Sequence, residues 1–240
     1  MANEAEEHLK QSISLESQNS EAHYYLAMIL RSDDDPSLAK KHFFRALEIN
    51  PEYSLAYYEL AHHSEKNGDL NEAKIHFQKA TDIEQNFVEA YFHLARICTN
   101  PSEYDQAFRN YETALEIEPN MAECHYWFGK LLTSGEKLKN DGTLVFEADP
   151  ERAEEHFRKA IKINPKYSKA FFKLGLLLKD LKRYNEAYEN LEKSILINPK
   201  LAEAHYHLAV LLMDENAQKA ISRETHKKPS LSKAKGITKR

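Results

Sequence analysis

The chain has 240 residues, of which 42% are hydrophobic and 30% charged, and it contains only six glycines and eight prolines. This composition favours helices and excludes a collagen-like or intrinsically disordered chain. The formal charge of −5 combines a basic end with an acidic body. Residues 219–240 carry eight Lys or Arg and one acid, a charge of +7, so residues 1–218 carry −12. This negative charge disfavours nucleic acid as a partner of residues 1–218.

The first expected element lies within residues 1–19. Ala5, Leu9, Ser12 and Leu15 recur there at helical spacing. The tripeptide Asn-Glu-Ala at 3–5 returns at 71–73 and again at 185–187. We therefore expect residues 1–19 to be the second helix of a partial repeat, with the natural protein extending upstream of Met1, or else an N-terminal capping helix.

Residues 20–201 contain an internal repeat, which we divide into 20–53, 54–87, 88–121, 122–167 and 168–201. In each repeat an alanine is followed, at steps of four, three and three, by a large apolar residue, a small residue and an isoleucine, so all four share one helix face. The alanines are Ala39, Ala73, Ala107, Ala153 and Ala187, the large residues Phe43, Phe77, Tyr111, Phe157 and Leu191, and the isoleucines Ile49, Ile83, Ile117, Ile163 and Ile197. Each repeat is thus predicted to end in an amphipathic helix.

The first half of each repeat carries a second apolar set, in which Leu or Phe is followed by a small residue. These pairs are Leu26-Ala27, Leu60-Ala61, Leu94-Ala95, Phe128-Gly129, Leu174-Gly175 and, beyond the fifth repeat, Leu208-Ala209. A small residue lets two helices cross closely, and the large residue of the second helix then fills the space beside it. Each repeat is therefore predicted to be an antiparallel helix pair.

The repeat at 122–167 is 12 residues longer than the others, because its alanine follows the previous one by 46 rather than 34 positions. The extra residues fall between its two helices, around 135–150. Asn140-Asp141-Gly142 is a turn signal, and 143–146 is a short β-prone run. This insertion is either a tolerated surface loop or a lip at the rim of a binding groove.

Residues 202–222 are predicted to form the first helix of a partial sixth repeat or a C-terminal cap. Leu208, Leu211 and Leu212 would be exposed there unless 216–228 folds back as a capping helix or two molecules pack together. The basic tail, 223–240, is predicted to be disordered, although such a run can also bind RNA, lipid or a nuclear import receptor. The N-terminus has no basic start or apolar stretch, and no apolar run reaches the length of a membrane span. We therefore expect an intracellular, cytoplasmic protein, with a nuclear location left open by the basic tail.

This pattern resembles the tetratricopeptide repeat (TPR) family, in which a 34-residue unit places Trp, Leu-Gly, Tyr, Ala, Phe and Pro in this order. The resemblance covers residues 5–215. The position of the family's Trp departs from the pattern, since it holds His23, Tyr57, Tyr91, His125, Phe171 and His205. The resemblance implies an all-α fold, a right-handed α-solenoid of antiparallel helix pairs (a TPR superhelix).

The resemblance also implies a concave groove lined by the first helix of each repeat, with positions 2, 5, 6 and 9 facing inward. Position 5 is aromatic throughout, which serves either partner binding or packing between repeats. The inward positions of the later repeats hold Lys and Arg side chains. These cations are either free to bind an anion or neutralised by carboxylates of the same chain. The predicted partner-binding residues are Tyr58, Phe92, Arg96, Tyr126, Trp127, Lys130, Lys169, Phe172 and Lys173.

Catalytic chemistry is not expected from this sequence. The six glycines do not cluster into a phosphate-binding loop, and no two of the twelve histidines stand three or four residues apart on one helix. We therefore expect no catalytic residue, no cofactor and no metal site. The two cysteines, Cys98 and Cys124, are predicted to be small buried residues rather than a disulfide.

The sequence thus predicts a non-catalytic scaffold that binds other proteins in its concave groove. The bound segment is an extended peptide, which can be acidic, or a helix. The exposed last helix also offers a surface for self-association. Two alternatives stay open. One is that the chain is an adaptor region of a larger enzyme. The other is that it binds chaperone tails, but the window Phe92, Arg96, Trp127, Lys169 and Lys173 lacks the two asparagines of the family's carboxylate clamp.

Overall fold

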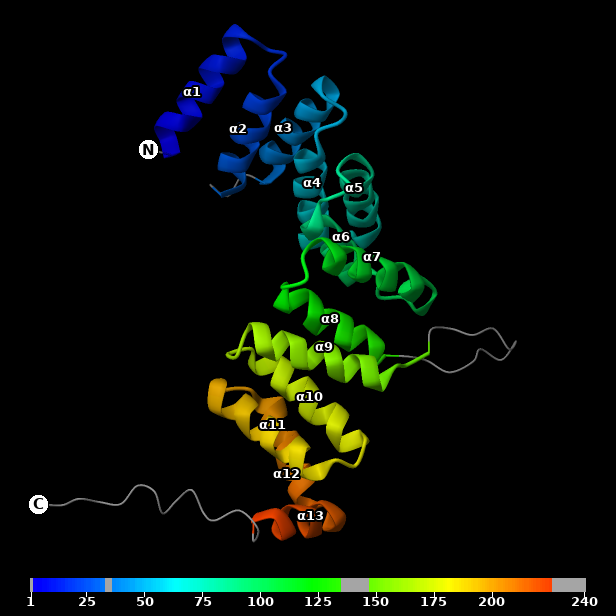
Figure 1. Ribbon diagram of the computed structural model, residues 1–240. Helices are drawn as coiled ribbons and strands as arrows, with labels where there is room; N and C mark the ends of the chain where they lie inside the picture. The colour runs from blue at the N-terminus through cyan, green and yellow to red at the C-terminus, as the bar shows by residue number, and fades with distance from the viewer. Residues whose placement is uncertain (1, 33–35, 135–146, 226–240) are drawn as a thin grey trace, which may run out of the picture. The chain divides into compact units, whose positions relative to one another are not determined.

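The computed structural model describes residues 2–32, 36–134 and 147–225. Within these ranges the chain forms thirteen α-helices, one 3₁₀ helix and no β-strand, which confirms the predicted all-α fold (Figure 1). No helix in the described part of the chain has the length and apolarity needed to cross a membrane. The predicted insertion around 135–150 lies largely outside the described residues, as does most of the basic tail.

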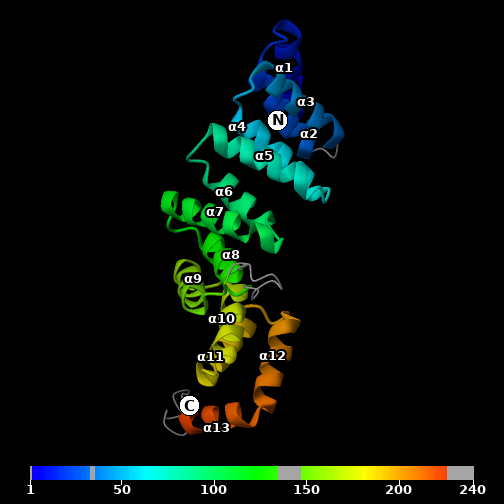
Figure 2. The same cartoon turned by 90° about the vertical axis from the view of Figure 1, so that its right-hand side faces the viewer.

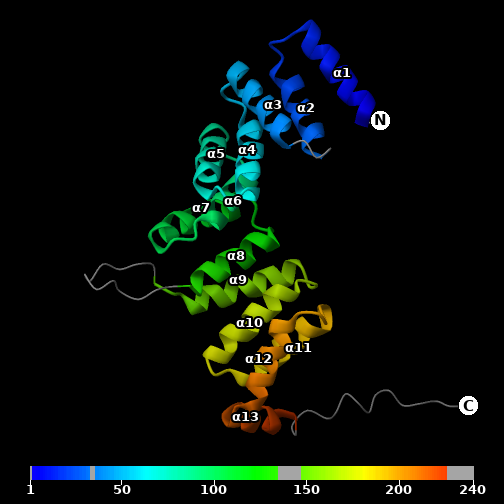
Figure 3. The ribbon, with the colours of Figure 1, turned by 180° about the vertical axis from the view of Figure 1, so that it is seen from behind.

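The chain divides into two compact units, Met1–Pro119 and Asn120–Arg240, here called the N-terminal and C-terminal units. In the N-terminal unit α2 packs on α3, α4 on α5 and α6 on α7, and successive pairs are joined by contacts of α3 with α4 and of α5 with α6, while α1 packs on α2. Figure 3 shows α4 and α5 side by side. The elements are α1 (Ala2–Leu15), α2 (Ser20–Ser32), α3 (Pro36–Ile49), α4 (Ser54–Lys66), α5 (Leu70–Ile83), α6 (Val88–Ile97), η1 (Pro101–Glu103) and α7 (Tyr104–Ile117).

The C-terminal unit repeats this arrangement, because α8 packs on α9, α10 on α11, and the pairs meet through α9 with α10 and α11 with α12. Its helices are α8 (Ala122–Leu132), α9 (Pro150–Ile163), α10 (Ser168–Asp180), α11 (Tyr184–Ile197), α12 (Ala202–Met213) and α13 (Glu215–Thr225). The last helix, α13, packs on both α11 and α12 and runs across their ends (Figure 2). Within this end of the unit Leu211 is buried, whereas Leu212 is 41% exposed.

The first three positions of the periodic stripe in each repeat form the core, whereas its isoleucines are only partly buried, and Ile117 and Ile163 are each 36% exposed. Phe43, Phe77 and Phe157 are each at most 1% exposed, and the alanines of the stripe are almost completely buried. The small residue on the facing helix is required by this packing: a Cβ added at Gly129 would lie 2.9 Å from Cε1 of Phe157, and one at Gly175 would lie 2.9 Å from Cγ of Leu191. The close crossing of the two helices therefore depends on the large and small residues together.

Polar residues start two of the second helices. The Asp69 side chain accepts a hydrogen bond from the backbone N–H of Glu72 at 3.2 Å, and Asp149 accepts one from the N–H of Arg152 at 3.0 Å. Such N-caps satisfy donors that the first turn leaves without a helical partner. Pro150 follows its cap at the first helical position, where its missing N–H costs nothing.

Both cysteines are free and buried, as the sequence predicted. Burial raises the pKa of the Cys98 thiol to about 11 and that of Cys124 to about 12. Since the thiolate is the reactive form, both thiols are protonated at neutral pH and act as small apolar residues.

Two pairs of histidines connect the helices of a repeat. Nδ1 of His125 on α8 lies 2.8 Å from Nδ1 of His156 on α9, and Nδ1 of His23 lies 2.9 Å from Nδ1 of His42 in the α2–α3 pair. Because one nitrogen must donate while the other accepts, the hydrogen bond requires that one ring of each pair be neutral. Burial lowers the pKa of His156 to about 4, and burial also lowers the pKa of His23 and His42.

The His125–His156 pair predicts that the C-terminal unit loses stability in mild acid. A pKa lowered in the folded state means that the unfolded chain, with a His pKa near 6.5, binds the proton more strongly. The stability that depends on a neutral His156 is fully present above pH ~6.5 and is lost as the pH falls towards about 4. At pH 5 the free energy of unfolding is therefore lower by about 2 kcal/mol because of His156. Denaturant unfolding at pH 7 and pH 5 measures this loss.

His156→Asn supplies the control for that measurement, because Asn110 and Asn190 occupy the same place before the large apolar residue in other repeats. We expect this variant to lose about 2 kcal/mol less than the wild type between pH 7 and pH 5. The same change at the exposed His205 should leave the wild-type loss unaltered. If the wild type and His156→Asn lost equal stability between pH 7 and pH 5, His156 would not be the cause of the acid sensitivity.

Candidate functional site

The residues predicted to bind a partner fall in both units. Tyr58, Phe92 and Arg96 belong to the N-terminal unit, whereas the C-terminal unit holds the other six: Tyr126, Trp127, Lys130, Lys169, Phe172 and Lys173. All nine lie on the first helices of the repeats, namely α4, α6, α8 and α10.

The aromatic residues at position 5 are mainly packing residues. Phe92 is 2% exposed, Phe172 4% and Tyr126 7%. Several of these rings contact, in a tilted arrangement, the aromatic residue that closes the same repeat: the ring centroids are 4.9 Å apart for Tyr24–Tyr53, 4.8 Å for Tyr58–Phe87 and 5.1 Å for Tyr126–Tyr167. The rings of Tyr24, Tyr58 and Tyr126 therefore pack within their own repeats.

Arg96 on α6 is neutralised within the N-terminal unit. Its Nη2 donates to Oε1 of Glu65 at 2.5 Å and to Nδ1 of His93 at 3.0 Å. Arg31 of α2 forms a comparable ion pair with Glu59 of α4. The two acidic side chains of α4 thus pair with arginines from the helix pairs before and after it, and the cation of Arg96 is not free to bind an anionic partner.

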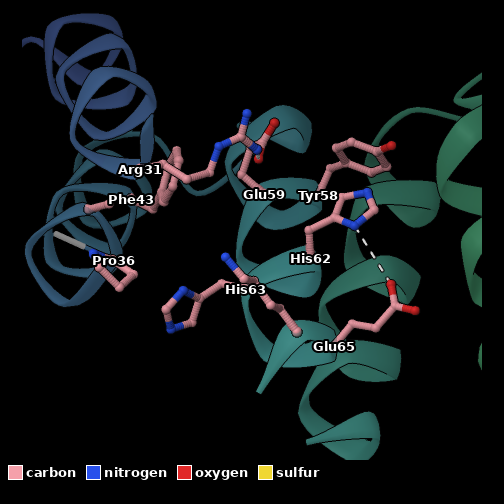
Figure 4. Close-up of a pocket in the computed structure, with 10 residues that line it drawn as sticks. Arg31, Pro36, Phe43, Tyr58, Glu59, His62, His63 and Glu65 are labelled. Carbon is pink, nitrogen blue, oxygen red and sulfur yellow. Dashed lines mark hydrogen bonds and ion pairs between the residues drawn. The ribbon is translucent and has the colours of Figure 1, made fainter. Parts of the chain in front are cut away.

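A cavity of about 790 Å³ lies in the N-terminal unit beside these pairs. Residues of α2, α3 and α4 line it, among them Arg31, Phe43, Tyr58, Glu59 and His62 (Figure 4). Burial raises the pKa of Glu59, opposed by the charge of Arg31, and burial raises the pKa of Tyr58 to about 12. The cavity therefore has an aromatic wall, and its charged residues Arg31 and Glu59 form an ion pair with each other.

Three lysines on the first helices α8 and α10 of the C-terminal unit have no acidic partner among the residues that the structure describes. Lys130 and Lys173, from the neighbouring first helices α8 and α10, are partly buried, and Lys169 is exposed. Nζ of Lys130 lies 4.5 Å from the ring centroid of Trp127. Burial, and then the charge of Lys173, lower the pKa of Lys130. Among the residues described by the structure, no carboxylate forms an ion pair with these lysines, which we call the lysine cluster (Lys130, Lys169 and Lys173).

Sequence reasoning missed one group of polar residues. His62 and Glu65 of α4 and His93 of α6 have potential metal-binding atoms that all lie within 4.8 Å of one another. The spacing of histidines within one helix does not indicate this group, because its second histidine, His93, comes from the next repeat. A signal was present, since His62 and His93 occupy positions 9 and 6 of consecutive repeats, both expected to face inward.

Comparisons with known proteins identify repeats in both units. One sequence model of the tetratricopeptide repeat matches residues 55–87, 88–121 and 143–167, and a second matches residues 156–189. No curated protein matches the chain significantly in sequence.

Solved structures share the fold at low sequence identity. YrrB, described as a TPR protein with an unusual peptide-binding site, is 21% identical over 83% of this chain and 96% of its own, with a TM-score of 0.67. MamA is 21% identical over 74% of this chain and 97% of its own, with a TM-score of 0.62. Yeast Tom70 is 19% identical, with a TM-score of 0.58, and covers 95% of this chain with 45% of its own.

Proposed function

The chain belongs to the tetratricopeptide repeat family, and on that premise we propose that it is a non-catalytic scaffold for protein interactions. Within a unit, the first helices of the repeats bind a segment of another protein, which is an extended peptide or a helix. The peptide-binding site attributed to YrrB, whose fold this chain shares, supports this proposal.

The lysine cluster indicates which chemical groups the partner carries. Lys130 and Lys173 bring like charges together from adjacent helices, and their proximity contributes to lowering the pKa of Lys130. Holding cations together costs free energy that a bound anion would offset. The indole of Trp127 beside Lys130 offers an aromatic surface of the kind that dominates interface energies. We infer that the C-terminal unit binds a segment bearing carboxylates, such as an acidic peptide or a chain terminus.

An array of random peptides tests this function directly. Each peptide is presented twice, with a free C-terminal carboxylate and as the C-terminal amide, and is probed with the purified full chain. We expect bound peptides to be rich in Asp and Glu or to require the free carboxylate, and binding to weaken as salt is raised. Selection of neutral or basic peptides, unaffected by amidation, would contradict the proposed partner chemistry.

A further inference from the structure

His62, Glu65 and His93 bring two imidazoles and a carboxylate together across two neighbouring repeats of the N-terminal unit. Oε2 of Glu65 lies 3.6 Å from Nδ1 of His62, three residues earlier on α4. The ring centroids of His62 and His93 are 4.4 Å apart, at 80° to each other. Two His and one carboxylate form a ligand set that proteins use for zinc.

The two rings are held in place by aromatic neighbours. His93 stacks on Phe77 with ring centroids 5.6 Å apart and only 10° between the planes, and Tyr58 meets His62 edge to face at 4.6 Å. These ring contacts hold the two imidazoles next to each other at the boundary between the two repeats.

A cation already occupies this group. Nη2 of Arg96 contacts both Oε1 of Glu65, at 2.5 Å, and Nδ1 of His93, at 3.0 Å. Because a guanidinium can only donate, Nδ1 of His93 must accept and therefore carries its lone pair towards Arg96. The guanidinium thus interacts with an oxygen and a nitrogen that could instead bind a metal ion.

We propose that His62, Glu65 and His93 form a binding site for a divalent transition metal such as Zn²⁺, with the guanidinium of Arg96 taking the place of the ion when no metal is bound. Ligand bonds of about 2.0–2.2 Å place tetrahedral ligand atoms about 3.4 Å apart. Atoms within 4.8 Å of one another reach this spacing by movements on the order of 1 Å. The Arg96 side chain is 25% exposed and can turn towards solvent to admit the ion.

Access to the site is provided by the cavity described above, since His62 and Glu65 both line it. Figure 4 shows these two side chains on the same side of α4, with the interaction between them marked. Three protein ligands leave a fourth position of a tetrahedral ion for water or a partner's side chain.

Zn²⁺ titration of the full-length, chelator-treated protein against a chromophoric chelator tests the proposal. We expect one tightly bound equivalent, and at least about tenfold weaker binding in His62→Gln and in His93→Gln. We expect tighter binding in Arg96→Gln, because this change removes the competing cation. A merely structural role of the three ligands does not predict this gain.

His63→Gln is the matched control, since His63 adjoins His62 but interacts with Asn67 instead. Its Zn²⁺ affinity should equal that of the wild type. Circular dichroism verifies the fold of each variant, and Glu65→Gln replaces any ligand variant that does not fold. The proposal is overturned if neither the wild type nor Arg96→Gln binds Zn²⁺, or if ligand variants and control bind it equally, which would place the ion at other histidines.

Discussion

Replacing Phe43 by alanine lowers the free energy of unfolding of the N-terminal unit by about 3–5 kcal/mol, the expected cost of removing a fully buried ring. Phe43 is 1% exposed and packs in the core of the α2–α3 pair, with its ring 5.8 Å from that of Tyr24. Domains of this size are stable by only about 5–15 kcal/mol, so the change removes a large share of the total. Thermal and denaturant unfolding, followed by circular dichroism, measure the loss.

The neighbouring Phe44 provides a matched control. It is the same residue type on the same helix, but it is 39% exposed. Its ring centroid lies 5.7 Å from Nζ of Lys40 and 6.3 Å from the ring centroid of His76. Because Phe44 is already partly exposed to solvent, Phe44→Ala should cost less than about 1 kcal/mol. Similar losses for the two variants would show that the periodic stripe is not what holds the repeat together.

Reversing two charges of the lysine cluster should abolish most of the proposed peptide binding. With the double change Lys169→Glu and Lys173→Glu, we expect the affinity for an acidic peptide selected from the array to fall more than tenfold. An exposed charge contact contributes up to about 1 kcal/mol, a partly desolvated one contributes more, and the new carboxylates repel the ligand. The remaining binding should depend less on salt, because fewer ion contacts are made.

Lys162→Glu with Lys166→Glu is the matched control. These two lysines have the same spacing of four residues and are exposed at the end of α9 and in the turn that follows it. The control therefore changes the net charge of the unit equally without touching the lysine cluster. Titration of the fluorescently labelled peptide compares the variants. If both double variants lose affinity equally, only the net charge of the unit attracts the peptide. If neither does, the peptide binds elsewhere.

Much of the fold could be predicted from the sequence, because one-dimensional periodicity directly encodes which face of a helix is buried. The spacing of Ala39, Phe43 and Ala46 predicted a buried stripe, and all three are at most 2% exposed. The small residues at Gly129 and Gly175 indicated close helix crossings, and there the facing side chains leave no room for a Cβ. These features repeat in every helix pair, so each repeat gives independent support to the prediction.

The tertiary structure decided which side chains meet across repeats. The resemblance to the family implied an inward position for Arg96, but neither it nor the periodicity could indicate that Glu65, 31 residues earlier, lies 2.5 Å away. Nor could the sequence pattern show that His93 lies beside His62, or that Phe92 and Phe172 are buried. Such contacts depend on the angle and distance between neighbouring helix pairs and on side-chain rotamers, and a pattern along one chain specifies none of these. The sequence by itself therefore determined the repeats and their buried faces. Helix packing decided which charged and polar residues are paired. It also decided which of them, like Lys130 and Lys173, have no acidic partner among the described residues.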